Sequence, residues 1–164
     1  MAAVAVFQTS DVKGDVVFAT TRGGVRVRAT FAALPSGEHG FHIHKAGDLR
    51  GEGCAGACEH WSLTPANHGG APGGRGSAER HTGDLGNIVG PSGTYTYFLK
   101  DANVEDLYGR SVIVHADRDD LGLGDEPDSK TTGHSGARIA CAIIGRAKLC
   151  AAARRTRRRR LSPQ

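Results

Sequence analysis

The stretch His39-Gly40-Phe41-His42-Ile43-His44 places two imidazoles two residues apart inside an apolar run that contains glycine. Successive side chains of a β-strand point to opposite faces, so His42 and His44 share one face and Phe41 and Ile43 share the other. Neutral imidazole is the commonest nitrogen ligand for metals, and two on one side of a strand make half of a metal site. A half-polar strand with two exposed histidines is the alternative for this hexapeptide alone.

Short alternating runs continue along the chain and favour an all-β fold. The predicted strands, separated by glycine, aspartate or serine turn signals, cover residues 4–8, 15–21, 25–33, 40–44, 81–89, 93–99, 111–117 and 137–145. A chain of 164 residues suits one domain, and 24 glycines with 5% aromatic residues favour turns over long helices. Two segments lack periodicity, about residues 45–80 and 116–136, and loops this long usually carry function. We therefore predict eight antiparallel strands with two long functional loops.

The net charge of +4 comes from the end of the chain. Seven cations and no acid lie in residues 148–164, among them six arginines within 154–160. Without those seven, the other 147 residues hold 14 Lys and Arg against 17 Asp and Glu, a net charge of −3. We therefore divide the chain into a domain at 1–147 and a basic, Arg-rich tail at 148–164 that we expect to be disordered. Binding to nucleic acid or another polyanion is expected of the tail alone.

Neither a signal peptide nor a membrane span is predicted. The first residues lack a charged start followed by a long apolar run, and no stretch of the chain is apolar enough to cross a bilayer. We expect a soluble cytoplasmic protein with no membrane partner; the nucleus and a viral particle are the alternative locations.

The first long loop and its end hold three histidines and an aspartate within 25 residues: His60, His68, His81 and Asp84. Three nitrogens and one oxygen around a tetrahedral ion suit zinc. His115, at the end of another predicted strand, could join His42 and His44, and two metal sites would adjoin if one histidine served both. The alternative is that these loop histidines are separate and exposed to solvent. Four candidate ligands in this order argue against that alternative.

Six blocks in this order resemble the copper/zinc superoxide dismutases: GFHIHKAGD, HGG, ERHTGDLGN, VIVHADRDDLG, TTGHSGARIAC and AIIG. The resemblance extends from about residue 3 to 147. It implies a flattened eight-stranded Greek-key barrel or sandwich that converts superoxide to oxygen and hydrogen peroxide. The run CAGACEHW at 54–61 resembles divergent members of this family encoded by large DNA viruses.

The resemblance also implies roles for individual residues. The implied copper ligands are His42, His44, His60 and His115, and the implied zinc ligands are His60, His68, His81 and Asp84. His60 bridges the two ions and passes a proton to the product. Asp119 matches the carboxylate that hydrogen-bonds one copper ligand and one zinc ligand, here His42 and His68.

Substrate capture is implied for Arg138, which matches the arginine that docks the anion at the mouth of the copper channel. Lys130 and Thr132 are expected to attract superoxide and narrow the channel, while His134 is expected at the channel rim. His39 is expected to bond backbone groups beside the copper strand.

The cysteines Cys54 and Cys141 occupy the positions of the family's intrasubunit disulfide. Cys58 and Cys150 have no counterpart in the common pattern, and we hypothesise that they form a second disulfide; two free thiols are the alternative.

The sequence departs from the family in the first long loop and at the usual dimer seam. Twelve residues separate His68 and His81 where about eight are usual, and Trp61-Ser62-Leu63 replaces Phe-Asn-Pro. Ala46 and Arg146 stand where family dimers place large apolar or aliphatic residues, although the seam positions Tyr108, Gly109 and Ile143 remain. We therefore expect a weak homodimer at most.

Three other functions are kept as alternatives. A metal-delivery or metal-buffering protein would pair with an active enzyme, but the complete ligand set and Arg138 argue against it. A nucleic-acid-binding protein would use RRTRRRR at 154–160. A zinc hydrolase needs an open zinc position, whereas this zinc site has four ligands. The resemblance also suggests a copper-delivery protein as a partner.

Overall fold

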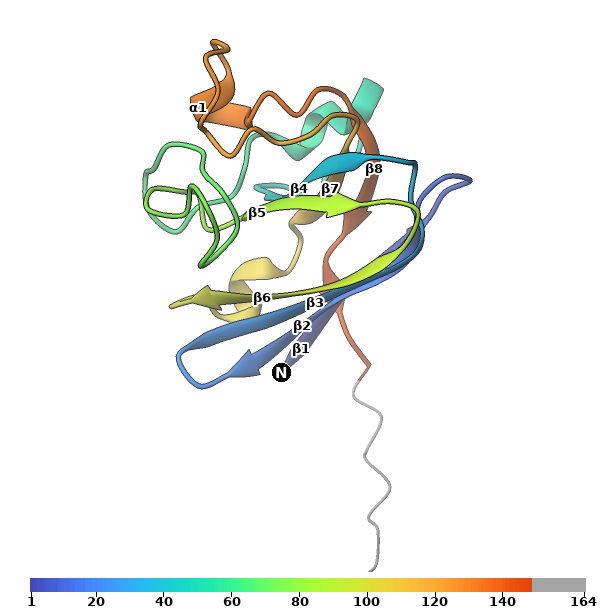
Figure 1. The fold of residues 1–164 in the computed structure, drawn as a ribbon. Helices are drawn as coiled ribbons and strands as arrows, with labels where there is room; N and C mark the ends of the chain where they lie inside the picture. The colour runs from blue at the N-terminus through green and yellow to red at the C-terminus, as the bar shows by residue number, and fades with distance from the viewer. Residues whose placement is uncertain (149–164) are drawn as a thin grey trace, which may run out of the picture.

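Two antiparallel β-sheets pack face to face in the computed structural model, which describes residues 1–148 (Figure 1). One sheet has the order β6-β3-β2-β1-β9, with β1 (Ala2–Gln8), β2 (Lys13–Thr21), β3 (Gly24–Ala33), β6 (Gly93–Lys100) and β9 (Gly145–Arg146). The other has the order β5-β4-β7-β8, with β4 (Glu38–His44), β5 (Asp84–Val89), β7 (Ser111–His115) and β8 (Arg138–Ile143). The chain crosses between the sheets after β3, β5, β6 and β8, as in a Greek-key sandwich. The predicted all-β class is confirmed.

The strand count differs from the prediction at the end of the domain. The last predicted strand, 137–145, splits into β8 and the two-residue β9. Ile144 leaves the sheet because its N–H donates to the carbonyl of Arg110 and its own carbonyl accepts from Gly109. After this break β9 pairs with β1, so the chain passes from the four-stranded to the five-stranded sheet.

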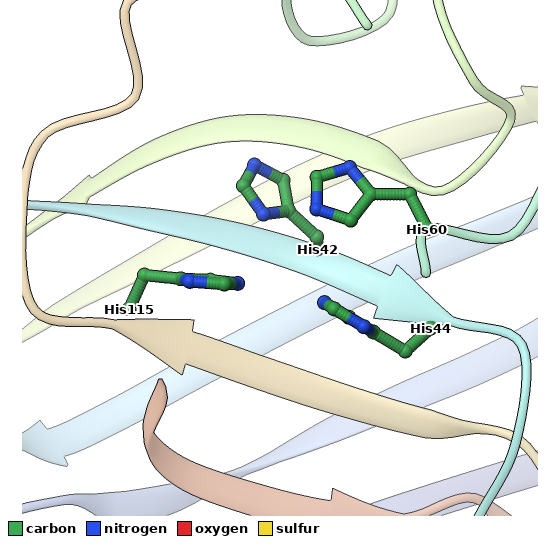
Figure 2. A group of neighbouring side chains, drawn as sticks. All are labelled: His42, His44, His60 and His115. Atoms are coloured by element: carbon green, nitrogen blue, oxygen red, sulfur yellow. The ribbon is translucent and has the colours of Figure 1, made fainter. Parts of the chain in front are cut away.

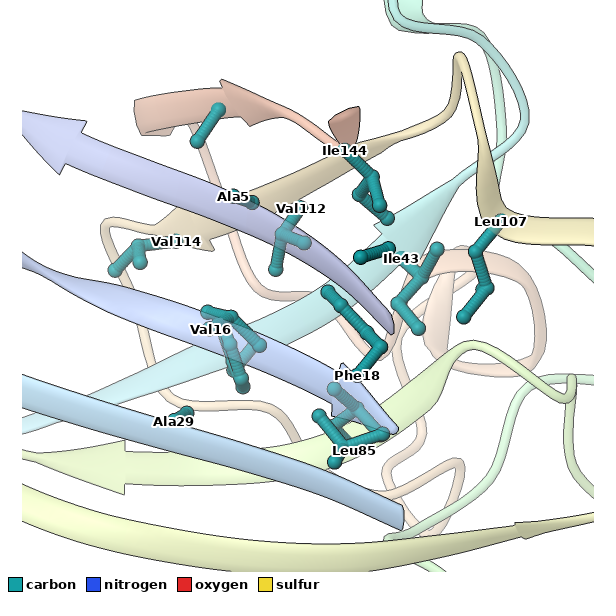
Figure 3. Packing of buried hydrophobic residues seen from close by; sticks show 14 of the residues in the cluster. Ala5, Val16, Phe18, Ala29, Ile43, Leu85, Leu107, Val112, Val114 and Ile144 are labelled. Atoms are coloured by element: carbon teal, nitrogen blue, oxygen red, sulfur yellow. The ribbon is translucent and has the colours of Figure 1, made fainter. Parts of the chain in front are cut away.

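The core forms where the inward faces of the two sheets meet, as Figure 3 shows. Alternate residues of β1 and β3 are buried there, including Phe7 and Val27, and their neighbours face solvent, as a strand with one wet face requires. Phe18 and Ile43 are fully buried from opposite sheets. At about 25 cal/mol per Å² of apolar surface, each such side chain contributes roughly 1.5–3 kcal/mol.

Strand β4 is buried on both faces, as are β7 and most of β5. Phe41 and Ile43 point into the core, while His42 and His44 lie on the outer face. That outer face is covered by the two long loops, and Figure 1 shows η1 (Glu52–Ala57) and α1 (Ser129–Thr132) on this side of the sheet. The two histidines are therefore enclosed, which excludes the alternative of exposed strand histidines.

The first long loop is tied to β8 by the predicted disulfide between Cys54 and Cys141, which is confirmed. Cys150, the predicted partner of Cys58, lies outside the described part of the chain. The disorder predicted for the tail also concerns residues outside that part. A third short helix, η2 (Val104–Leu107), connects β6 and β7. No helix within residues 1–148 has the length and apolar character needed to cross a bilayer.

Candidate metal centre

Four histidines from three parts of the chain meet on the outer face of the four-stranded sheet. His42 and His44 come from β4, His115 ends the neighbouring β7, and His60 lies in the first long loop, where it forms a β-bridge with His44. Figure 2 shows the four imidazole rings turned toward a common space. Each side chain is at most 3% exposed, and their ligand atoms lie within 4.8 Å of one another.

Backbone carbonyls fix one nitrogen of two of these rings. His44 Nδ1 lies 2.8 Å from the carbonyl oxygen of Cys58, and His115 Nδ1 lies 3.2 Å from that of Gly136. A carbonyl can only accept, so each Nδ1 carries the proton. The Nε2 atoms of both rings are therefore left with a free lone pair.

Carboxylates fix the other two rings in the same way. His42 Nε2 lies 2.8 Å from Oδ2 of Asp119, and His60 Nδ1 lies 2.8 Å from Oδ1 of Asp84. The free nitrogens are then Nδ1 of His42 and Nε2 of His60. The bond to Asp119 is of the kind that orients a metal-binding imidazole and raises its basicity, whereas the Asp84 contact lies within a second cluster.

The four free nitrogens have no hydrogen-bond partner within the described chain: His42 Nδ1, His44 Nε2, His60 Nε2 and His115 Nε2. An unpartnered buried polar atom is costly, and four that converge on one point require an explanation. A bound metal ion that accepts the lone pairs of these four nitrogens would explain the arrangement, and four imidazole nitrogens suit copper. The residues present therefore fit a copper ion.

A second cluster shares His60 with the first. His60, His68, His81 and Asp84 bring three Nδ1 atoms and one carboxylate oxygen together. Asp84 Oδ1 lies 2.8, 3.1 and 3.3 Å from the three Nδ1 atoms in that order, and the Nδ1 atoms of His60 and His68 are 3.3 Å apart. Ligands at zinc distances and tetrahedral angles would be about 3.3 Å apart. This cluster therefore fits zinc.

The Asp84 carboxylate is oriented by backbone N–H groups of the first long loop and its end. Its Oδ2 accepts from the N–H of His81 at 2.7 Å and from that of Gly69 at 3.0 Å. These two bonds leave Oδ1 directed at the cluster of imidazoles. Arg80 adds support from behind, donating to the carbonyl oxygens of Asp84 and Thr82.

Asp119 joins the two clusters from the second long loop. Its Oδ2 accepts from His42 and its Oδ1 from His68, both at 2.8 Å, as the resemblance implied. Gly133 is required beside this link because its φ is +69° and an added Cβ would lie 2.1 Å from Asp119 Oδ1. A single carboxylate thus sets the orientation of one ring in each cluster.

The electrostatic surroundings differ between the two clusters. Burial holds the pKa of His42 and His44 well below the usual range and lowers the pKa of His115 to about 4, so these rings are neutral at pH 7. Burial acts the same way on His68, but its hydrogen bonds to Asp119 and Asp84 outweigh it and raise its pKa to about 9. In the metal-free chain at pH 7, these three copper-cluster rings are therefore neutral, whereas His68 of the zinc cluster carries an extra proton.

Zinc binding to the metal-free chain is therefore expected to release about one proton near pH 7, whereas copper binding to its own cluster should release almost none. The proton on His68 Nδ1 must leave before that nitrogen can bind an ion, and below pH 9 zinc affinity should fall about tenfold per pH unit on this account. A pH indicator in weakly buffered solution measures the release. Equal proton release for both metals would contradict the assignment.

A cavity of about 780 Å³ opens the copper cluster to solvent. His44, His60 and His115 line its floor, and Arg138 and Lys130 line its walls. The Arg138 guanidinium is held by the carbonyl oxygens of Cys54 and Cys58 at 2.7 and 2.6 Å. Arg138, Lys130 and Thr132 thus all line one cavity, and Lys130 also donates to the carbonyl of Gly122.

Of the remaining histidines, His39 bonds backbone groups as expected, whereas His134 is not among the residues that line the cavity. His39 is buried with its ring nitrogens 2.9 Å from the carbonyl oxygen of His115 and 3.2 Å from that of Pro35. His134 is exposed and pairs with Asp128 at 2.7 Å, and this hydrogen bond raises its pKa. Neither belongs to a ligand cluster of the described residues.

The sequence analysis missed Asn87 on β5. Its side chain donates to the carbonyl of Asp119 at 2.8 Å and accepts from the N–H of the same residue at 2.7 Å. This two-point bond anchors the second long loop to the sheet at the residue that links the clusters. Its place in the ERHTGDLGN block, three residues after Asp84, is the only signal in the sequence.

Comparison with known proteins decides the family. The family model described as copper/zinc superoxide dismutase matches residues 12–144. The chain belongs to the copper/zinc superoxide dismutase family. Members of this family are oxidoreductases that use copper and zinc to convert superoxide to oxygen and hydrogen peroxide, and this is the function of the chain. Its two ligand clusters suit both metals.

Two curated relatives of the dismutase are viral, in agreement with the resemblance of its CAGACEHW run. The copper/zinc superoxide dismutase of Paramecium bursaria Chlorella virus 1 is 42% identical over 155 residues, which cover 90% of this chain and 80% of the relative. A putative copper/zinc superoxide dismutase of Orgyia pseudotsugata multicapsid polyhedrosis virus is 50% identical over 120 residues, covering 68% and 75%. The crystal structure of the clock protein EA4 is similar with a TM-score of 0.75 and 35% identity, covering 88% of this chain and 93% of that one.

Proposed function

We propose that the two ligand clusters hold the two metals of the family and share one histidine. The copper ligands are His42, His44, His60 and His115; the zinc ligands are His60, His68, His81 and Asp84. The convergence of four unpartnered, buried nitrogens carries this assignment, and three of their residues, His44, His60 and His115, line one cavity. When bound, copper supplies the alternating one-electron oxidation and reduction of superoxide, and zinc supplies a fixed positive charge beside it.

Arg138 orients the substrate in this proposal. Its guanidinium lines the same cavity as His44 and His60, and two backbone carbonyls hold it in place. A planar, permanently charged group fixed in this way can dock a small anion and exclude larger ones.

His60 delivers a proton to the product. Two superoxide ions and two protons give one oxygen and one hydrogen peroxide, so each cycle needs two protons. His60 Nε2 faces the cavity while its Nδ1 belongs to the zinc cluster, so Nε2 can supply one proton and water the other.

Single substitutions can test the division of ligands. His44→Ala should lower copper content and leave zinc bound, and His81→Ala should do the reverse. His134→Ala, which changes an exposed histidine outside both ligand clusters, is the control and should retain both metals. Metal analysis of the purified variants provides the readout. Loss of both metals to the same extent from His44→Ala and His81→Ala would refute two distinct sites.

A weak homodimer is the proposed assembly. Ala46 is half-buried and offers little apolar area, while Arg146 is exposed with its guanidinium 4.9 Å from the Tyr108 ring centroid. Ile143 is 51% exposed and remains available for association. Sedimentation at low micromolar concentration should therefore show mostly monomer, because a charge at an apolar seam is unfavourable. A tight dimer would contradict this proposal.

The tail at 148–164 is proposed to bind nucleic acid or another polyanion, because it carries seven cations without an acid. Retention on DNA should weaken with salt and disappear in a chain that ends at Ala153.

Cytoplasmic location and copper supply by a delivery protein stay predictions.

A further inference from the structure

An ion pair stands at the mouth of the copper cavity, next to two of the copper ligands. Lys45 follows His44 and Glu59 precedes His60, and the N–H of Lys45 donates to the carbonyl of Glu59 at 2.9 Å. Lys45 Nζ lies 3.0 Å from Glu59 Oε2, with the two side chains 53% and 77% exposed. The backbone thus fixes both charges relative to the ligand pair.

The cavity gathers three cations and a single acid. Arg138, Lys45 and Lys130 line it, and Glu59 is the one carboxylate among the described residues that do so. Glu59 is close enough to affect Arg138 as well: burial lowers the pKa of Arg138, and the Glu59 charge partly opposes that shift. A carboxylate in this position reduces the positive potential that an incoming anion meets.

A contribution to stability alone is a weaker explanation of the Lys45–Glu59 pair than an effect on the charge of the cavity. Exposed ion pairs contribute little to stability, and the two segments are already joined by backbone hydrogen bonds from Lys45 to Glu59 and from Trp61 to Ile43. Charge near the path of an anion, in contrast, changes its rate of capture at long range.

We propose that Glu59 limits the rate of anion capture by pairing with Lys45 and so withholding one of the three cations at the cavity mouth. The inference rests on the proposed role of this cavity as the entrance for superoxide. Steering of superoxide by positive charge is a known property of this family, and Lys45 and Glu59 are additional residues on which it would depend here. One unit charge about 8–10 Å from the anion changes the rate about twofold in dilute salt, and less as salt screens it.

The chain offers a matched control pair. Lys100 ends β6 of the five-stranded sheet and Asp101 follows it in a turn; their charged atoms lie 4.0 Å apart, their side chains are 80% and 75% exposed, and neither lines the cavity. Glu59→Gln and Asp101→Asn each replace an acid by its amide and raise the net charge by one. Only the position of the added charge differs between them.

The experiment compares these variants with the unaltered, metal-loaded chain. The second-order rate constant with superoxide should rise about 1.5–2-fold in Glu59→Gln at about 0.01 M ionic strength and by less at about 0.15 M. It should stay unchanged in Asp101→Asn. Lys45→Gln should lower it by a similar factor, and Lys45→Gln combined with Glu59→Gln should return it close to the original value.

Azide affinity gives a second readout that does not depend on turnover. Titration of this inert anion against the copper absorption should show tighter binding in Glu59→Gln by the same factor, and no change in Asp101→Asn. Equal rates and affinities in these two variants, or a gain in Glu59→Gln that salt leaves unchanged, would overturn the inference. Failure of the unaltered chain to consume superoxide with both metals bound would instead overturn the proposed function.

Discussion

His60→Ala should reduce superoxide-scavenging activity by more than about 100-fold and abolish the communication between the two metal sites. His60 is the one residue common to both clusters, with Nδ1 at 2.8 Å from Asp84 and Nε2 free toward the copper cavity. Removal of an outer partner of a metal ligand typically costs 10–100-fold, and removal of a ligand shared by two ions should cost more. Steady-state assays on metal-loaded protein measure the loss.

Zinc removal provides the control for the shared ligand. In the unaltered chain, chelation of zinc should alter the copper absorption spectrum, because the same imidazole serves both ions. In His60→Ala, chelation should leave that spectrum unchanged. Retention of full activity by His60→Ala would count decisively against the bridging role.

Arg138→Ala should retain both metals but react with superoxide at least about tenfold more slowly, with a weaker dependence on ionic strength. The guanidinium is the cation most firmly fixed in the cavity, so its loss removes both the docking group and part of a positive field; charged clefts as a whole typically raise capture rates by 10–10³. Rate measurements across ionic strength show whether the loss is electrostatic.

Arg138→Lys separates charge from shape in this test. Lysine keeps the positive charge but lacks the planar fork whose two nitrogens bond separately to the carbonyls of Cys54 and Cys58, so an intermediate rate is expected. Because the Cys58 carbonyl also holds His44, copper content must be compared in both variants. An Arg138→Ala variant as fast as the unaltered chain would show that another group docks the anion.

Much of the fold follows from local patterns in the sequence. Alternation along β1, β3 and β4 predicted the strands because one face of each must be buried. The break between β8 and β9 was missed because it depends on two hydrogen bonds with a loop distant in sequence: Ile144 donates to Arg110 and accepts from Gly109. Apolar periodicity continues through this break, so the pattern gave no sign of it.

The ligand set was predictable from motifs, but its surroundings were not. His42 and His44 share a face by strand geometry alone, whereas the positions of His60 and His68 depend on loops without periodicity. The anchoring of Asp119 by Asn87 and the pairing of Lys45 with Glu59 join segments 32 and 14 residues apart. Contacts of this kind arise from tertiary packing, which composition and spacing do not specify.

Copper and zinc content, determined on the same purified sample as its superoxide-scavenging rate, tests the central claim most directly. The account predicts one copper and one zinc per chain, with scavenging that depends on copper and exceeds that of an equal amount of free copper. A chain that binds zinc but no copper, or that binds both and scavenges no faster than free copper, would contradict it.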